Sequence, residues 1–412
     1  MIAIGLSFVA GIIFMFLGNG HTIFRRLFPW VLLILGTPLV IGGGLYSPTW
    51  FFSDYLSQTY TVTVWIMVCL YLCVFRGKRC KNYPRFEYDA LLFFSTCGAL
   101  ILGLSRNYVG VFLGFEILSI PLYILVASRR DWISLEASIK YFIVGAFSSA
   151  LFLMGIACIL IATGSLWMGA TTPLQELIPL LMLGKVMVGT TFLFKLGFIP
   201  FHFWLPDVYQ GSPLSFLGFM AVMVKLAGFM IAVRLINLPF MDNTTWIILA
   251  VLTLITLVVA TITMLSQQSF KRMMGYSAIA NTGFMSLILL SRIGASGEGL
   301  FLLVSIGVYA LSIWAVFFGL GILKQDADDP SIQSLRGCVK KHPVATGICC
   351  AGLLSLAGFP PFPGFFIKAA IMILICHSQH WGLLWVALIT SLIGMGTYLN
   401  YVMVMLDRRI DD

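Results

Sequence analysis

Long apolar stretches separated by short polar connections dominate the chain. Thirteen of them approach the about 20 residues that an α-helix needs to cross a bilayer. Lipid offers no hydrogen-bond partner to an open backbone, and no β-barrel alternation is visible, so these stretches are predicted to be transmembrane helices. They cover Ile2–Leu17, Phe28–Tyr46, Tyr60–Phe75, Ala90–Leu104, Tyr108–Ala127, Ile139–Thr163, Ile178–Ile199, Leu214–Ile236, Trp246–Leu265, Met273–Leu290, Leu300–Leu323, Val344–Ile375 and Leu383–Leu406.

The composition agrees with this interpretation. Of 412 residues, 60% are hydrophobic and only 10% are charged, whereas soluble domains carry about 25% charged residues. So few charges cannot cover a soluble protein of this length, which excludes a soluble enzyme, a secreted disulfide scaffold and a disordered chain. The net charge of +9 forms no basic, aromatic-rich patch that would hold a nucleic acid. The nine cysteines lie mostly in apolar runs without metal-ligand spacing and are predicted to be small buried hydrophobes.

The basic residues of the connections predict an orientation. With the N-terminus outside, the inner side carries 17 of the 25 Lys and Arg residues and the outer side carries three. Positive residues accumulate on the cytoplasmic side of membrane proteins, so the N-terminus is predicted outside and the C-terminus inside. The inner residues are Arg25, Arg26, Arg76, Lys78, Arg79, Lys81, Arg85, Arg129, Arg130, Lys271, Arg272, Lys324, Arg336, Lys340, Lys341, Arg408 and Arg409, and the outer ones are Arg106, Arg234 and Arg292.

Four ionisable residues lie where a membrane helix least accommodates a charge. A charged side chain at the centre of a span costs about 2.5–3.5 kcal/mol on insertion scales. Glu116 and Lys225 fall near the middle of their predicted spans, and Lys195 and Lys368 lie beside helix interruptions. Desolvation disfavours the charged forms of Glu and Lys, so a row of such groups can exchange protons, which Arg cannot do. The pattern favours proton transfer; the alternative is a set of static ion pairs that hold helices together.

Three other residues leave their roles open. Lys140 lies near the inner end of its predicted span, where its ammonium can reach the interface by snorkelling. Lys185 lies about seven residues inside the next span, where snorkelling is also possible, and no role is assigned to it. His202 follows a helix interruption, where it either relays protons or caps the broken helix.

The interruptions belong to an internal repeat. The string Gly-Phe-x-Pro-Phe occurs at 197–201 and again at 358–362. Proline removes a helical hydrogen bond and clashes with the preceding turn, so both helices should break there. Five spans separate the two strings, and an odd number inverts the second copy. We therefore predict an all-α integral membrane fold of about 13 helices, with an N-terminal segment (1–84) and two inverted five-helix repeats (85–240, helices 4–8, and 241–412, helices 9–13), in which helices 7 and 12 are discontinuous.

The chain resembles the antiporter-like subunits of respiratory complex I. The carrying motif is Phe-Lys-Leu-Gly-Phe-Ile-Pro-Phe-His-Phe-Trp-Leu-Pro-Asp-Val-Tyr-Gln-Gly-Ser-Pro at 194–213, whose Pro-Asp-Val-Tyr-x-Gly form is closest to the N-type subunit. Segments 115–123, 135–142 and 271–277 are also similar, and the resemblance covers about residues 85 to 405. The family usually has fourteen helices, against the thirteen predicted here, and often has His where this chain has Asn281.

This resemblance implies a proton-translocating subunit of NADH:quinone oxidoreductase, an enzyme of the EC 7.1.1 class, with no redox centre in this chain. It places Glu116, Lys195, Lys225 and Lys368 on a midplane proton path driven by quinone reduction in neighbouring subunits. NADH, flavin, iron–sulfur clusters and quinone are expected in partner subunits, and homologous antiporter-like subunits among the partners. The form of residues 119–123 favours a bacterial inner membrane over the mitochondrial one. A subunit of a cation/proton antiporter or of a membrane hydrogenase is the alternative.

Overall fold

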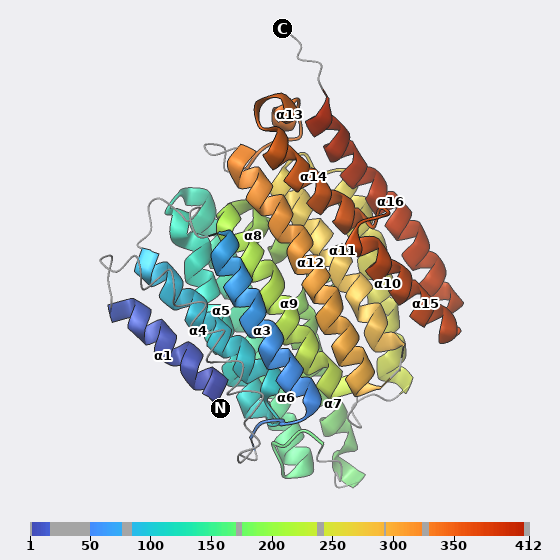
Figure 1. Cartoon of the computed structure of the whole chain (residues 1–412). Helices are drawn as coiled ribbons and strands as arrows, with labels where there is room; N and C mark the ends of the chain where they lie inside the picture. The colour runs from blue at the N-terminus through green and yellow to red at the C-terminus, as the bar shows by residue number, and fades with distance from the viewer. Residues whose placement is uncertain are drawn as a thin grey trace.

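The computed structural model describes residues 2–16, 50–75, 85–169, 175–236, 243–291, 294–323 and 329–407. Over these ranges every regular element is a helix, and the helices form one bundle (Figure 1). Ten of the described helices are long and apolar enough to cross a membrane. The predicted all-α membrane fold is thus confirmed, whereas the predicted span Phe28–Tyr46 and most basic residues of the inner connections lie outside the described residues.

The helices follow the predicted order of spans. The N-terminal segment and first half contain α1 (Ile2–Phe16), α3 (Tyr55–Val74), α4 (Arg85–Leu104), α5 (Tyr108–Val126), α6 (Trp132–Thr163), α7 (Ile178–Leu196), α8 (Trp204–Gly211) and α9 (Leu214–Ile236). The second half contains α10 (Asn243–Leu265), α11 (Phe270–Leu290), α12 (Ala295–Leu323), α13 (Cys338–Lys341), α14 (Pro343–Ala357), α15 (Pro363–His377) and α16 (Trp381–Leu406). Short 3₁₀ turns cover Ala127–Arg129, Gln175–Leu177 and Gln333–Leu335.

The sixth predicted span begins earlier than its apolar pattern indicated. We predicted a start at Ile139, but α6 begins at Trp132. Asp131 is the N-cap, and its carboxylate accepts a hydrogen bond of 3.0 Å from the Ser134 amide. A capping carboxylate satisfies amides that have no partner inside the helix. About two further turns therefore precede the predicted start, and they carry Glu136, which pairs with Lys140.

Both predicted helix interruptions are present. The first separates α7 from α8, and Gly197 ends α7 in the left-handed region with φ of 75°. The Phe198 amide donates to the Leu193 carbonyl at 2.9 Å, which closes the last turn. Only glycine adopts this conformation at little cost, and such caps satisfy the free carbonyls of a helix end.

The second interruption repeats the first in detail. It separates α14 from α15, Gly358 has φ of 78°, and the Phe359 amide donates to the Leu354 carbonyl at 3.0 Å. In Figure 1, α7 starts at the lower end of the bundle and α14 starts at the upper end, beside α13. The two broken helices therefore run in opposite directions, as the predicted inversion requires.

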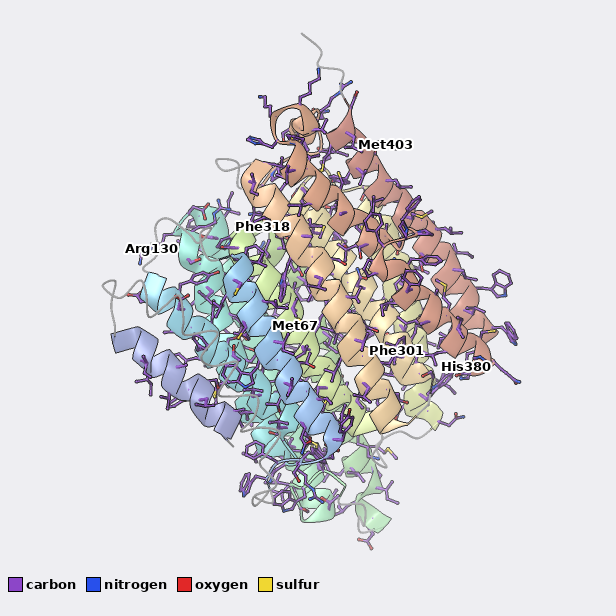
Figure 2. All side chains as sticks on the ribbon, viewed as in Figure 1. Met67, Arg130, Phe301, Phe318, His380 and Met403 are labelled. Atoms are coloured by element: carbon purple, nitrogen blue, oxygen red, sulfur yellow. The ribbon has the colours of Figure 1, made fainter. Side chains whose placement is uncertain are left out.

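Helices α9 and α11 form the centre of the bundle. Both are buried along almost their whole length, whereas fewer than half of the residues of α6, α7, α10 and α16 are buried. Exposed apolar side chains such as Met403 project from the outside of the bundle (Figure 2). A bundle with an apolar outer surface is suited to lipid or to neighbouring membrane helices.

Glycines allow neighbouring helices to approach closely. A Cβ atom at Gly98 of α4 would lie 2.1 Å from the Leu118 amide nitrogen of α5. A Cβ atom at Gly352 of α14 would lie 2.6 Å from the Ser312 carbonyl oxygen of α12. Small residues are the usual solution where membrane helices pack backbone to backbone.

We expect Gly98→Ala to destabilise the protein by about 1–3 kcal/mol, because the added methyl group must push α5 away from α4. Gly396→Ala on α16 is the matched control, since a Cβ atom there meets no other atom within 4 Å. Thermal unfolding in detergent measures both variants. Equal melting temperatures for the two would show that the α4–α5 contact does not limit stability.

An ion pair joins α3 to α9 at one end of the bundle. The Arg234 side chain is only 8% exposed and donates to both carboxylate oxygens of Asp54, and its Nη2 lies 2.9 Å from Ser57 Oγ. Partial burial raises the pKa of the Asp54 carboxyl, but hydrogen bonds from Arg234 and Ser57 outweigh this effect and hold that pKa well below its usual range. The charged form of Asp54 therefore stabilises the folded protein.

We expect Asp54→Asn to destabilise the protein by about 2 kcal/mol, because Arg234 stays buried without its counter-charge. Since the pKa of Asp54 is lowered by folding, its contribution is present above pH about 4 and is lost as the pH falls. The melting temperature of the wild type should therefore fall more steeply below pH about 4 than that of the variant. Parallel pH profiles would contradict this assignment.

Candidate functional site

Glu116 and Lys195 lie close together but are held by different partners. Glu116, half-buried on α5, accepts a hydrogen bond from the Ser149 hydroxyl of α6. Lys195 Nζ donates to Ser119 Oγ at 3.0 Å and lies 3.5 Å from the Tyr123 hydroxyl, both on α5. Among the described residues no ion pair joins Glu116 to Lys195. The structure therefore shows the two charges apart, each on a neutral hydroxyl.

Lys195 occupies the last turn of α7, directly before the helix break. Free carbonyls and the helix dipole make such an end favourable for a cation. Lys368 lies on α15 but its Nζ donates to the Ala357 carbonyl, the last residue of α14, at 3.0 Å. Both lysines therefore lie near the carboxyl end of a broken half-helix, but only Lys368 donates to a carbonyl of that end, whereas Lys195 donates to hydroxyls of α5.

Lys225 lies on the central helix α9, between the two broken helices, and is 4% exposed. Its Nζ donates to the Ala278 carbonyl at 2.6 Å and to the Thr282 hydroxyl, both on α11. The ammonium also lies 5.2 Å from the centre of the Tyr309 ring on α12, a favourable cation–π distance. Neutral oxygens and an aromatic ring thus surround Lys225 in the described part of the chain, and no carboxylate pairs with it there.

Two small cavities lie beside these lysines. The first contains both Lys195 and Lys225 in its lining, together with Tyr141, Trp204 and Tyr209, and leaves about 20 Å³ for the centre of a water molecule. The second leaves about 30 Å³ and is lined by Lys368, Asn281, Ser305, Tyr309, Ser312 and Ser355, among others. A cavity holds a water when this space exceeds roughly 10–15 Å³ and polar groups are present. Both cavities meet these conditions.

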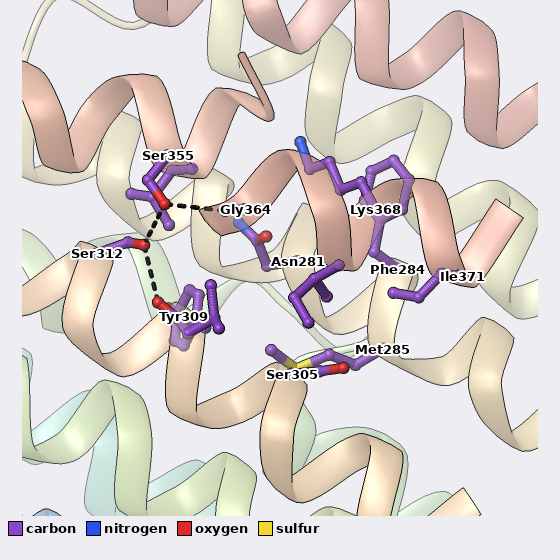
Figure 3. A pocket seen from close by; sticks show the side chains of 13 residues that line it. Asn281, Phe284, Met285, Ser305, Tyr309, Ser312, Ser355, Gly364, Lys368 and Ile371 are labelled. Atoms are coloured by element: carbon purple, nitrogen blue, oxygen red, sulfur yellow. Dashed lines mark hydrogen bonds between the residues drawn. The ribbon is translucent and has the colours of Figure 1, made fainter. Parts of the chain in front are cut away.

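Figure 3 shows the second cavity from close by. Ser312, Ser355 and Tyr309 lie on one side, Lys368 and the Phe284 ring lie on the other, and Asn281 is between them. Ser312 Oγ and Ser355 Oγ are 2.7 Å apart, and Ser355 Oγ also accepts a hydrogen bond from the Gly364 amide. The cavity therefore presents hydroxyls opposite the Lys368 side chain.

The structure does not bring the other candidate residues to these cavities. His202 lies half-buried in the segment between α7 and α8, with its ring centre 6.2 Å from that of Tyr276. Lys185 is half-buried on α7, ten residues before Lys195. Neither contributes to the lining of the two cavities. The relay or capping role of His202 stays a prediction.

Lys140 belongs to an ionic cluster that the sequence did not reveal. Its Nζ lies 2.8 Å from the Glu136 carboxylate on α6 and 2.9 Å from that of Asp207 on α8. Asp207 also accepts a hydrogen bond of 2.6 Å from Arg272 on α11, and Arg272 donates to Gln210 Oε1 at 3.0 Å. Asp207 therefore joins α8 to α6 and α11. Its place within the Pro-Asp-Val-Tyr motif was the signal that could have directed attention to it.

The position of Lys271 also differs from the prediction. We counted it among the residues of a polar loop, but it lies in the first turn of α11 and is completely buried. Its Nζ donates to the Ser212 carbonyl at 2.8 Å, at the end of α8. The free carbonyls of the α8 end provide the polar partner that allows the burial.

We expect Asp207→Ala to loosen α8, because Lys140 and Arg272 lose a shared carboxylate, at a cost of about 1–2 kcal/mol. Glu136→Ala is the control, since the ion pair between Glu136 and Lys140 lies within α6 and does not join two helices. Hydrogen–deuterium exchange of residues 204–211 measures the effect. Faster exchange in both variants, or in neither, would contradict the proposed importance of Asp207.

Comparison with known proteins identifies the family. The family model "NADH:quinone oxidoreductase/Mrp antiporter, TM" matches residues 105–394. NADH-quinone oxidoreductase subunit 14 of Thermus thermophilus is 37% identical over 317 residues, which cover 77% of this chain and 70% of the relative. NADH-quinone oxidoreductase subunit N of Cytophaga hutchinsonii is 34% identical over 322 residues, with the same coverage. The chain belongs to this family, which confirms the resemblance seen in its motifs.

Solved structures agree on the fold. A chain of respiratory complex I from Thermus thermophilus superimposes with a TM-score of 0.81 at 28% identity, over 100% of this chain and 91% of that chain. A chain of an archaeal membrane-bound sulfane sulfur reductase gives a TM-score of 0.86 at 21% identity, over 98% and 87%. The second similarity, at this identity, concerns the fold alone.

Proposed function

We propose that the chain is the N-type, proton-translocating membrane subunit of an NADH:quinone oxidoreductase. Its relatives bear that enzyme's name, and the family model covers most of the chain. The observation that supports proton movement is the row of two buried lysines, Lys195 and Lys225, and the half-buried Lys368, with two water-sized cavities along it. A static set of ion pairs would bring each lysine to a carboxylate, and the described partners of these lysines are neutral oxygens and rings.

The proposed path runs from Glu116 through Lys195 and Lys225 to Lys368. The first cavity lies between Lys195 and Lys225, so water there can carry a proton from one amine to the other. Beyond Lys225, the second cavity leads to Lys368. Each amine accepts a proton as a lone pair becomes available and releases it to the next group, so the subunit is unchanged after the proton has passed.

Glu116 is proposed to control the charge of Lys195. Two unit charges at about 8 Å and an effective dielectric of about 20 interact by about 2 kcal/mol. Moving the carboxylate from Ser149 toward Lys195 would therefore favour the protonated amine, and moving it away would favour proton release. Ser149 on one side and Ser119 on the other provide a neutral partner for each charge when the two are apart.

The energy for this movement is proposed to come from partner subunits. NADH oxidation, the flavin, the iron–sulfur clusters and quinone reduction belong to those subunits in this proposal, and the present chain carries protons only. It would lie in a bacterial inner membrane with the N-terminus outside and the C-terminus in the cytoplasm, beside other antiporter-like subunits.

A subunit of a cation/proton antiporter is the second candidate, because the matched family model includes Mrp antiporters. Purification of the native protein distinguishes the two. An NADH-oxidising soluble arm should accompany the subunit of an oxidoreductase, whereas sodium-dependent exchange without such an arm would indicate an antiporter.

We expect Lys195→Ala and Glu116→Ala each to lower proton pumping by at least about tenfold, because each removes a group that exchanges or controls the proton. NADH-driven acidification of inverted membrane vesicles measures this. Lys185→Ala is the control on the same helix, as Lys185 lines neither cavity. Normal pumping in the first two variants would refute the proposal, and loss of assembly without a pumping defect per assembled complex would favour static ion pairs.

A further inference from the structure

The hydroxyl of Tyr309 is buried at the junction of the two cavities. Tyr309 is 4% exposed, and its hydroxyl reaches the hydroxyl of Tyr209, but the two are not aligned for a full hydrogen bond. A buried hydroxyl with such a poorly aligned partner usually also binds water or has a function. Because Tyr309 lines the second cavity, water can supply a further partner there.

The neighbours of Tyr309 belong to both cavities. On one side its ring lies 5.2 Å from Lys225 Nζ, and its phenol interacts electrostatically with that of Tyr209, which lines the first cavity. On the other side, Ser312 and Ser355 share the second cavity with Tyr309 and face Lys368. Tyr309 is therefore placed where a proton leaving Lys225 enters the water of the second cavity.

The other polar groups near this junction are less able to pass a proton. The Thr282 hydroxyl accepts a hydrogen bond from Lys225 and directs its one proton to the Ala278 carbonyl of its own helix at 3.0 Å, or to Leu196 at 3.3 Å. The Asn281 amide donates to the Ser277 carbonyl at 2.8 Å, and an amide does not accept and release protons near neutral pH. Neither group therefore offers a hydroxyl proton to the second cavity.

We propose that Tyr309 relays protons between Lys225 and the cavity of Lys368, an inference that rests on the proposed function. The phenol oxygen accepts a proton from the Lys225 side, through a water, while its own O–H proton leaves to a water beside Ser312 and Ser355. The phenol is neutral before and after, and rotation of its O–H bond returns it to the starting orientation. One O–H bond forms and one breaks, so no other reactant is required.

Tyr309→Phe tests the relay, because it removes the hydroxyl and keeps the ring beside Lys225. In the assembled complex we expect NADH-driven proton pumping to fall about tenfold or more, at an unchanged amount of assembled complex. Tyr401→Phe is the matched control: it also removes a buried tyrosine hydroxyl, but this one donates to the Gln267 carbonyl and lines neither cavity. Pumping in the control should match the wild type.

Tyr309→His adds a readout that a structural role would not affect. It places a protonatable ring at the same position, so it should pump faster than Tyr309→Phe and shift the pH profile of pumping toward the range in which His titrates. Rates are compared per assembled complex, so a change in protein amount does not obscure the result. If Tyr309→His is no faster than Tyr309→Phe, the hydroxyl is not a relay.

Lys225→Ala separates this inference from the function on which it rests. If Lys225→Ala stops pumping while Tyr309→Phe pumps like the wild type, the relay is wrong and the proposed proton path stands. If Lys225→Ala also pumps normally, the proposed path itself is wrong.

Discussion

The cost of a charge in a low-dielectric interior is the constraint on which this structure depends. Lysines in membrane-spanning segments need polar partners inside the protein, since lipid provides none. Neighbouring helices supply these partners: α5 offers hydroxyls to Lys195, α11 offers a carbonyl and a hydroxyl to Lys225, and the end of the broken helix α14 offers a carbonyl to Lys368. Contacts between helices, and at Lys368 a helix break, are therefore the means by which these titratable groups are accommodated.

The two broken helices end alike but have different charges beside them. Each broken helix ends at a left-handed glycine with the same closing hydrogen bond. Lys195 has the carboxylate of Glu116 nearby, whereas the described lining of the Lys368 cavity contains hydroxyls, an amide and apolar groups. A charge on Lys195 therefore receives electrostatic support that a charge on Lys368 lacks.

Polar contacts outside the row of lysines join α8 to α6 and α11. Asp207 and Gln210 bind α8 to the start of α11, and α11 in turn carries the partners of Lys225. Lys140, interpreted from sequence as either snorkelling or functional, belongs to this cluster through Asp207. Lys140 and Asp207 are 67 residues apart in the sequence, so a local pattern could not reveal their contact.

Apolar length, proline position and the repeated Gly-Phe-x-Pro-Phe string were enough to predict the helical class, the two breaks and their opposite directions. These features depend on local backbone chemistry and on the thickness of the bilayer, which the order of residues expresses directly. The free-energy cost of a charge inside a membrane span, together with the helix interruptions, also singled out Glu116, Lys195, Lys225 and Lys368. The cavities, the separation of Glu116 from Lys195 and the position of Tyr309 were decided only by tertiary structure, because each depends on distances between helices that are remote in the chain.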